Sequence, residues 1–184
     1  MSDSLHTFVF EHAAVRGAIV QLDAAWRFMR SLRAHPPAVE TLLGESVVAA
    51  ALLASTLKRT HGKLLLQMQG DGALGLLLAE CSSDYGLRAT ARWTEPIAPA
   101  PLSEHLGTGR WVITLGGRGS ASYQGVVPIE SATLSQALES YMQRSEQLET
   151  QIALHASRDA AVGLLLQRVP GSAVSMRIRW PRAC

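Results

Sequence analysis

Three glycines at the spacing of a dinucleotide-binding loop are the first residues whose pattern could carry chemistry. Gly70, Gly72 and Gly75 match G-x-G-x-x-G and follow an apolar segment with the pattern of a strand. A pyrophosphate site also needs a helix directly after the glycines, because the amide groups at the helix N-terminus bind the phosphates. Here three leucines lead straight into the polar segment 81–84, which leaves no room for such a helix. The glycines therefore predict a hairpin turn, in which glycine adopts a positive φ without steric cost.

The other candidate motifs for catalysis or metal binding are incomplete. The glycine-rich segment 116–120 lacks the G-K-[ST] ending of a phosphate-binding loop and is typical of a hairpin tip. No serine lies in G-x-S-x-G, the motif of the hydrolase nucleophile. The six histidines are not spaced with carboxylates or cysteines as metal ligands are. We therefore predict that the protein is not an enzyme and that it has no catalytic residue, no metal site and no cofactor.

The two cysteines support the same interpretation. Cys81 and Cys184 are too few and too far apart for a disulfide framework or a zinc knuckle. Cys81 has no basic neighbour in the sequence that would lower the pKa of its thiol, so we expect a small buried residue rather than a nucleophile.

Length, composition and charge indicate one soluble domain. The chain has 184 residues, of which 47% are hydrophobic, enough to form a sizeable core. The net charge of +2 depends on three arginines within the last eight residues rather than on a basic face, so no nucleic-acid partner is expected. The longest apolar run, 47–54, is short for a membrane span, and the N-terminus does not resemble a signal peptide. We predict a cytoplasmic protein without a membrane partner.

The first third of the chain predicts an extended segment and two helices. Residues 8–22 are expected to be extended, with Gly17 as a possible bulge. Asp23 is a candidate cap for a helix whose apolar positions are Trp26, Met29 and Leu32. A longer helix over 38–58 is apolar around much of its circumference, which is typical of a central buried element, and Gly44 would permit a close contact there.

The remaining chain is dominated by the two-residue period of half-buried strands. Along 86–93, for example, apolar residues on one face alternate with polar residues on the other. The apolar residues are Leu87, Ala89, Ala91 and Trp93, and the polar ones are Arg88, Thr90 and Arg92. A short helix is expected over 102–106 and a longer one after Ser131 or Thr133. The other predicted strands are 64–69, 74–80, 110–115, 123–127, 152–156 and 163–169. The fold class is therefore α+β, with a mixed, mostly antiparallel sheet packed against helices.

Six short strings, taken together, resemble one family of bacterial proteins. They are Val15–Gly17, Leu52–Lys58, Leu66–Gly72, Tyr123–Val127, Tyr141–Gln147 and Gly163–Gln167. Their order and spacing are similar to those of the thirty-three-kilodalton heat-shock proteins, which are redox-regulated holdase chaperones. The resemblance covers about residues 5–171, nearly the whole chain.

The resemblance implies a core domain that tends to dimerise and an ATP-independent chaperone that binds unfolded or oxidatively damaged proteins under stress. In that family a helical linker and a small zinc domain with a C-x-C and a C-x-x-C motif follow the core. Oxidation releases the metal, unfolds the linker and uncovers apolar surface on the core. Loss of thiolate ligands removes the stability that a metal gives to a small domain, so this switch is physically coherent.

The end of this sequence departs from the family pattern. We expect a chaperone core domain at 1–171 and an unmatched basic tail at 172–184, without the linker or the zinc domain. Smaller departures are Ala73 and Glu149, at positions where the family tends to have proline.

The client surface is expected on an apolar sheet face. Its candidate contributors are Trp93, Trp111, Ile113 and Tyr123, because large aromatics dominate contact energetics. Strand aromatics are equally typical of core positions, so each of the four has a second interpretation. Two functions remain open: a holdase core that lacks its own zinc switch, and a structural or interaction remnant that no longer holds clients. An enzyme would require a converging pocket of perturbed titratable groups.

Overall fold

The computed structural model describes residues 2–56, 62–116 and 123–169. Within them nine strands and four helices form. The strands are β1 (Ser4–Val9), β2 (Val15–Leu22), β3 (Lys63–Gln69), β4 (Leu74–Ser82), β5 (Leu87–Trp93), β6 (Arg110–Gly116), β7 (Tyr123–Pro128), β8 (Thr150–Ala156) and β9 (Ala161–Arg168). The helices are α1 (Ala24–Leu32), α2 (Pro37–Thr56), α3 (Leu102–Leu106) and α4 (Leu134–Ser145).

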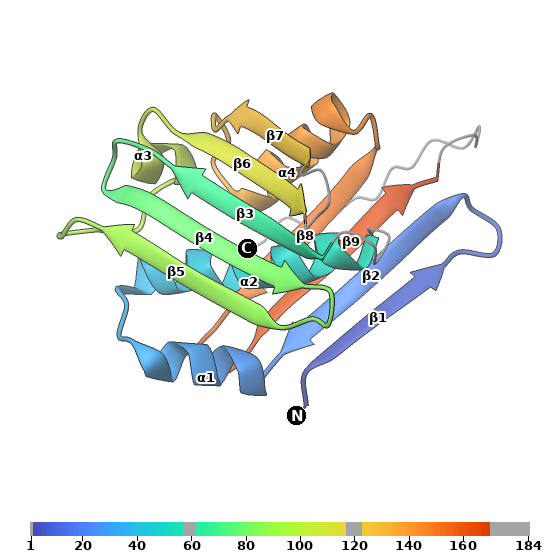
Figure 1. The fold of residues 1–184 in the computed structure, drawn as a ribbon, viewed down its shortest axis with the longest axis horizontal. Helices are drawn as coiled ribbons and strands as arrows, with labels where there is room; N and C mark the ends of the chain where they lie inside the picture. The colour runs from blue at the N-terminus through green and yellow to red at the C-terminus, as the bar shows by residue number, and fades with distance from the viewer. Residues whose placement is uncertain (1, 57–61, 117–122, 170–184) are drawn as a thin grey trace, which may run out of the picture.

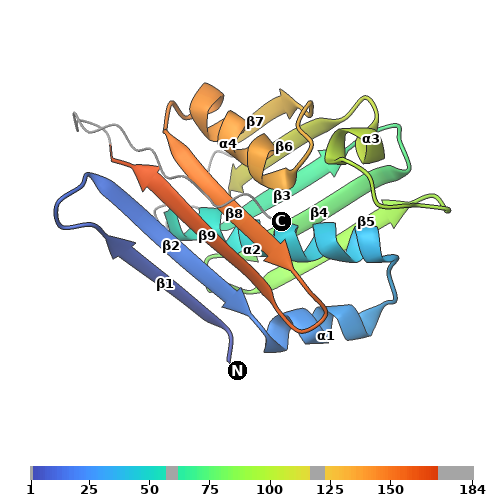
Figure 2. The ribbon, with the colours of Figure 1, turned by 180° about the vertical axis from the view of Figure 1, so that it is seen from behind.

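The strands form two sheets with a helix between them. The four-stranded sheet has the order β1-β2-β9-β8 and the five-stranded sheet the order β5-β4-β3-β6-β7. Each pairing is antiparallel. Helix α2 contacts strands of both sheets and lies behind the five-stranded sheet in Figure 1 and behind the four-stranded sheet in Figure 2. The predicted α+β class is confirmed, and the strands divide into two layers rather than one.

Helix α2 is the centre of the core. It begins at Pro37, where a proline is pre-organised for the first helical position, and eleven of its residues are buried. Its length and composition would suit a membrane span, and an 18-residue stretch of it has a mean hydropathy of 1.5. However, 67% of that stretch is buried inside the protein. The two sheets that cover α2 account for its apolar composition. Gly44 lies on α2 where a Cβ would come within 2.5 Å of Ala156 on β8, so the predicted close contact is confirmed.

The N-terminal segment is a hairpin, and the expectation of one extended segment over 8–22 is wrong. Strands β1 and β2 pair in unbroken register from Ser4–Gln21 to Val9–Arg16. The turn between them contains no glycine or proline, so the usual turn signal is missing from the sequence. Gly17 is not a bulge. It lies opposite Phe8, whose ring occupies the space that a side chain at Gly17 would fill.

A carboxylate from the residue before β1 caps helix α1, in place of the Asp23 side chain predicted from the sequence. Asp3 Oδ1 accepts hydrogen bonds from the amides of Asp23 and Ala24 at 2.7 and 2.9 Å, and Asp3 Oδ2 accepts one from Ala25 at 3.0 Å. Asp23 occupies the N-cap position without a capping side-chain bond, and its carboxylate accepts a bond from Gln21 instead. The hairpin and α1 are therefore tied together by one side chain.

We expect Asp3→Ala to destabilise the domain by about 1–2 kcal/mol, because the first amides of α1 lose their acceptor and the helix dipole loses a nearby negative charge. Denaturant unfolding of Asp3→Ala beside Glu11→Ala, an exposed control in the β1–β2 turn, measures this. Equal stability of the two variants would contradict the assignment of Asp3 as the cap.

The glycines at 70–72 form the predicted hairpin turn and also admit α3. Strands β3 and β4 pair across this turn, as expected. A Cβ at Gly70 or Gly72 would collide with backbone carbonyls of Leu106 and His105 at the end of α3. The amide of Gly72 donates to Leu106 O at 3.0 Å, and Asp71 Oδ1 accepts from the Thr108 amide at 2.7 Å. The short helix is thus docked on the turn by backbone contacts.

Helix α4 follows the sequence prediction and covers a sheet edge. Of the two candidate caps, Thr133 is the one used, and its hydroxyl accepts a bond from the Gln136 amide. The predicted apolar stripe (Leu134, Leu138, Tyr141, Met142) is buried. Glu139 Oε1 accepts a hydrogen bond from the backbone amide of Ile152 on β8, the outer strand of the four-stranded sheet. Burial raises the pKa of Glu139, and the bond from Ile152 opposes that shift.

Candidate functional site

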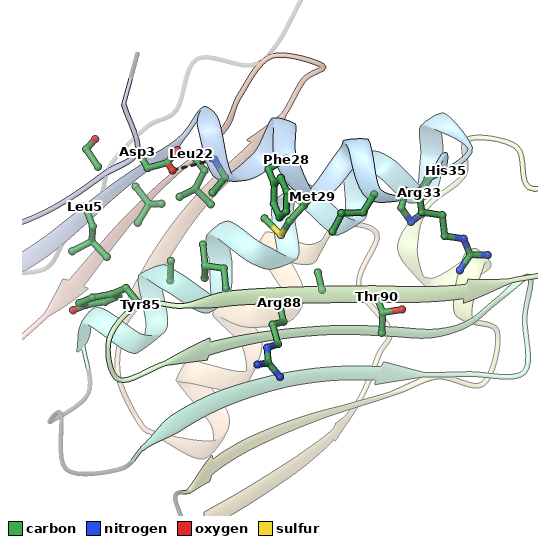
Figure 3. Close-up of a pocket in the computed structure, with 17 residues that line it drawn as sticks. Asp3, Leu5, Leu22, Phe28, Met29, Arg33, His35, Tyr85, Arg88 and Thr90 are labelled. Carbon is green, nitrogen blue, oxygen red and sulfur yellow. Dashed lines mark hydrogen bonds between the residues drawn. The ribbon is translucent and has the colours of Figure 1, made fainter.

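A groove between α1 and β5 is a large cavity lined by described residues. Its volume is about 770 Å³, and it is open to solvent. Helix α1 forms one wall, strand β5 the opposite wall, and the start of β1 closes one end (Figure 3). Ala51 of α2 and Val20 and Leu22 of β2 also line it. The groove therefore lies where the two sheets separate at one side of the central helix.

Most of the side chains that line the groove are apolar, and two large ones are exposed. Phe28 is 64% exposed and Leu32 67% exposed. Phe28 and Met29 point from α1 towards β5 in Figure 3. The sequence pattern gave Trp26, Met29 and Leu32 as the apolar positions of this helix. Trp26 is buried and Met29 partly buried, but Leu32 is exposed, because the groove separates the C-terminal end of α1 from the five-stranded sheet.

Arg33, His35 and Trp93 form a cluster at the far end of the groove. The Arg33 guanidinium lies 4.5 Å from the centroid of the Trp93 ring, a cation–π distance. The His35 ring lies 5.5 Å from the same ring. Partial burial, and secondly the Arg33 charge, lower the pKa of His35. The Arg33 guanidinium is thus the cation that lies against the Trp93 ring, and the lowered pKa of His35 favours a neutral imidazole beside it.

The structure separates the four predicted client contacts. Trp93 is half-buried on β5, beside the groove end formed by Arg33 and His35. Trp111 and Ile113, at 1% and 2% exposure, lie on the face of β6 that packs into the core, so in this conformation neither presents a surface to a partner. The backbone of Tyr123 pairs with Leu115, and its side chain lies outside the described part of the chain.

Cys81 has the properties expected of a core residue. Its side chain is buried on β4. Burial raises the pKa of its thiol to about 11, with further contributions from the nearby carboxylates of Asp84 and Glu80. A protonated, inaccessible thiol is a poor nucleophile and a poor metal ligand. Within the described ranges, no three histidine, cysteine or acidic side chains gather in a group that could hold a metal. Of the predicted hairpin tip at 116–120, all but Gly116 lies outside those ranges, as do the predicted tail at 172–184 and its Cys184.

Sequence reasoning missed two residues that line the groove, Phe28 and Arg33. It also missed that one side of β5 is open. One signal was available, because Phe28 lies outside the three-residue spacing of Trp26, Met29 and Leu32, so an apolar residue was left over on α1. The groove itself arises from the distance between two sheets, which no local pattern encodes.

Comparison with known proteins identifies the family. The model of the family described as Hsp33 protein matches residues 3–179. A protein of Methylobacillus flagellatus named 33 kDa chaperonin is 46% identical over 173 residues, which is 92% of this chain and 58% of that protein. A protein of the same name from Chromobacterium violaceum is 45% identical, over 91% of this chain and again 58% of its own length. This chain thus spans less than two thirds of these relatives.

The fold comparison agrees. The crystal structure of the 33 kDa chaperonin of Thermotoga maritima superposes with a TM-score of 0.75, covering 89% of this chain and 60% of that one, at 21% sequence identity. At that identity the similarity establishes the fold alone. Together with the family model and the curated relatives, it leads to one conclusion: this chain belongs to the Hsp33 family of chaperones.

Proposed function

We propose that this domain is an ATP-independent holdase, which binds apolar segments of unfolded proteins and keeps them from aggregating. The single observation that carries the proposal is the exposed apolar lining of the α1–β5 groove, in a chain whose relatives are named 33 kDa chaperonin. Burying apolar surface is the dominant favourable term in most protein association and is non-directional, which suits clients of many sequences.

The groove fits this role better than the buried aromatics do. Phe28 and Leu32 are exposed before any client arrives, whereas Trp111 and Ile113 are buried in the core and would reach a client only if the packing around β6 opened. We therefore assign client contact in this conformation to Phe28, Leu32 and the neighbouring Trp93. Trp111, Ile113 and Tyr123 remain predictions for a rearranged state.

The proposal extends to setting and partners. We propose a cytoplasmic homodimer that acts on unfolded clients during oxidative stress, with no nucleic-acid or membrane partner. For the 184-residue chain itself we propose client binding without zinc or oxidant, because apolar side chains, which need neither a metal nor a redox change to bind, form most of the groove. The alternative is an interaction domain that does not hold clients.

Light scattering from a heat-aggregating client enzyme separates these two functions. A holdase suppresses the scattering at near-stoichiometric ratios, without ATP and without oxidant. A chelator is expected to leave that suppression unchanged. Absence of suppression under reducing and oxidising conditions alike would favour the interaction domain and contradict the proposed function.

Phe28→Ser and Leu32→Ser are expected to weaken the suppression, each by roughly fivefold in client affinity, because each removes about 1 kcal/mol of apolar burial on binding. Val126→Ser is the matched control, since Val126 is 57% exposed but lies on β7, outside the groove lining. Substitutions at exposed positions change the unfolding free energy by about 0.5 kcal/mol or less, so we expect all three variants to fold. Melting curves of the variants check this. Equal loss in Val126→Ser would point to a surface that is not the groove.

A further inference from the structure

Strand β5 has an open edge that faces the groove. It is an outer strand of the five-stranded sheet and pairs on one side only, with β4. In an antiparallel pair, backbone groups of alternate residues point to opposite sides of the strand. The amide of Ser82 donates to Gly86 O, and continuing this bonding pattern along the register directs the backbones of Arg88, Thr90 and Arg92 towards β4.

The amides and carbonyls of Leu87, Ala89 and Ala91 therefore point to the open side. Within residues 2–56, 62–116 and 123–169, no hydrogen bond to these groups is present. Leu87 and Ala89 line the groove directly, opposite α1. An open strand edge beside an apolar surface is a template for a further strand.

The side chains around this edge alternate in character. Leu87, Ala89 and Ala91 face inward with the groove lining, and Ala91 is buried. Arg88, Thr90 and Arg92 face outward and are exposed. Neither Arg88 nor Arg92 has an ion-pair partner in the described residues. Asp3, the acidic residue of the groove lining, is bonded to the α1 amides. The field at the open edge is therefore positive.

We propose that the groove binds an extended polypeptide segment as an additional strand on β5. In this segment, apolar residues alternate with acidic ones. The apolar residues would lie against Leu87, Phe28 and Met29, and the acidic residues beside Arg88 and Arg92, as cross-strand pairs of opposite charge. The inference rests on the proposed function and names the class of client segment that the groove selects.

Ala89→Pro tests the strand pairing. Proline removes the one amide that Ala89 offers to an added strand, and that amide is not used by β4, so the sheet itself keeps its bonds. Ala89→Ser is the matched control, because it keeps the amide. The probe is a fluorescent peptide of about seven residues that alternates valine and glutamate, about the length of one strand. We expect Ala89→Pro to bind it about tenfold more weakly than the unchanged chain, as loss of a backbone hydrogen bond implies. We expect Ala89→Ser to bind it normally.

Two further probes keep the test independent of the variant's stability. The same peptide with methylated amides on alternate residues cannot pair and should bind the unchanged protein about tenfold more weakly. A peptide with lysine in place of glutamate should also bind more weakly at low salt, and Arg88→Glu, which leaves Arg92 in place, should greatly reduce that preference. Equal affinity for the methylated peptide would overturn strand addition, whatever Ala89→Pro does.

The outcomes distinguish this inference from the proposed function. If the chain suppresses client aggregation but Ala89→Pro suppresses it equally and binds the peptide normally, the holdase stands and strand addition is wrong. If Ala89→Pro changes only the oligomeric state, the β5 edge pairs with a second copy of the chain, which also overturns the inference. If the unchanged chain suppresses no aggregation yet binds the peptide with these preferences, the proposed function fails and the strand site remains.

Discussion

Gly163→Val is expected to destabilise the domain by about 3 kcal/mol, because it inserts a branched side chain where α2 touches β9. A Cβ at Gly163 would collide with the Val48 side chain and would lie 2.8 Å from Leu52 Cδ1 and 3.1 Å from Leu154 Cδ2. Val48 and Leu52 belong to the buried face of the central helix, which is held on its other side by the five-stranded sheet. The helix therefore has no direction in which to move. Thermal or denaturant unfolding measures the loss.

A compensating variant and a control make the test specific. Gly163→Ala alone should also be destabilising, and Val48→Ala should recover part of that loss in the double variant, since it removes the colliding methyl groups. Gly75→Ala is the control, because its new Cβ would meet only Arg92 atoms at 3.8 and 3.9 Å, an ordinary contact. If Gly163→Val were as stable as Gly75→Ala, close packing of α2 on β9 would not be what requires a glycine.

Elements with a long, regular period could be predicted from the sequence because local residues determine them. Helix α2 was expected over 38–58 and occupies Pro37–Thr56 in the described chain, and α3 was expected at its observed bounds. The inward positions of β6 were also predicted, since Trp111, Ile113 and Leu115 were placed on one side of the strand; the first two are buried, and Leu115 is partly buried against the core. Two-residue alternation indicates which face of a strand is buried, but it does not indicate which element packs against that face.

Features made by residues far apart in sequence could not be predicted. Asp3 caps a helix about twenty residues later, because the β1–β2 hairpin returns the chain to its starting point. Gly163 has no local sign of its helix contact, and in the sequence it is equally consistent with a turn. The division of nine strands into two sheets depends on β9 pairing with β2, a contact across most of the chain. The groove follows from that division.

The candidate site illustrates the same limit. The sequence directed attention to strand aromatics, because large aromatic side chains supply most contact energy. In the fold, Trp111 is used to fill the core, whereas Phe28 and Leu32 on α1 are the large apolar side chains that solvent reaches at the groove. Which apolar residue is exposed is decided by packing between elements rather than by residue type.

The domain is expected to lose stability as the pH rises from about 5 to about 8, and Glu45→Gln should remove much of that loss. Glu45 lies on α2, and burial raises the pKa of its carboxyl from 4.5 to about 7. In the described residues, no hydrogen bond or ion pair to this carboxylate offsets the cost of its charge. The folded state thus binds a proton that the unfolded state releases between these two pKa values.

The direction of the pH effect follows from that difference. Below about pH 4.5 the carboxyl is protonated in both states and the folded domain bears no charge cost. Between about pH 4.5 and pH 7 the carboxyl ionises in the unfolded state but stays protonated in the folded state, so the folded state becomes less stable by as much as about 3 kcal/mol, at 1.36 kcal/mol for each unit of pKa difference, and above pH 7 the loss levels off. Glutamine has a similar shape and no charge, so the Glu45→Gln variant should be more stable than the unchanged chain at about pH 8 and close to it at about pH 5.

Denaturant midpoints at the two pH values measure this difference, with Glu104→Gln as a control at an exposed position on α3. The quantity to compare is the change in unfolding free energy between the pH values, variant against unchanged chain, because His35 and Glu139 also titrate abnormally and contribute equally to both. A stabilisation by Glu45→Gln that is the same at both pH values would mean that Glu45 is charged or neutral throughout, and would contradict the raised pKa. A stabilisation confined to high pH would show that the charged Glu45 carboxylate on α2 destabilises the folded state.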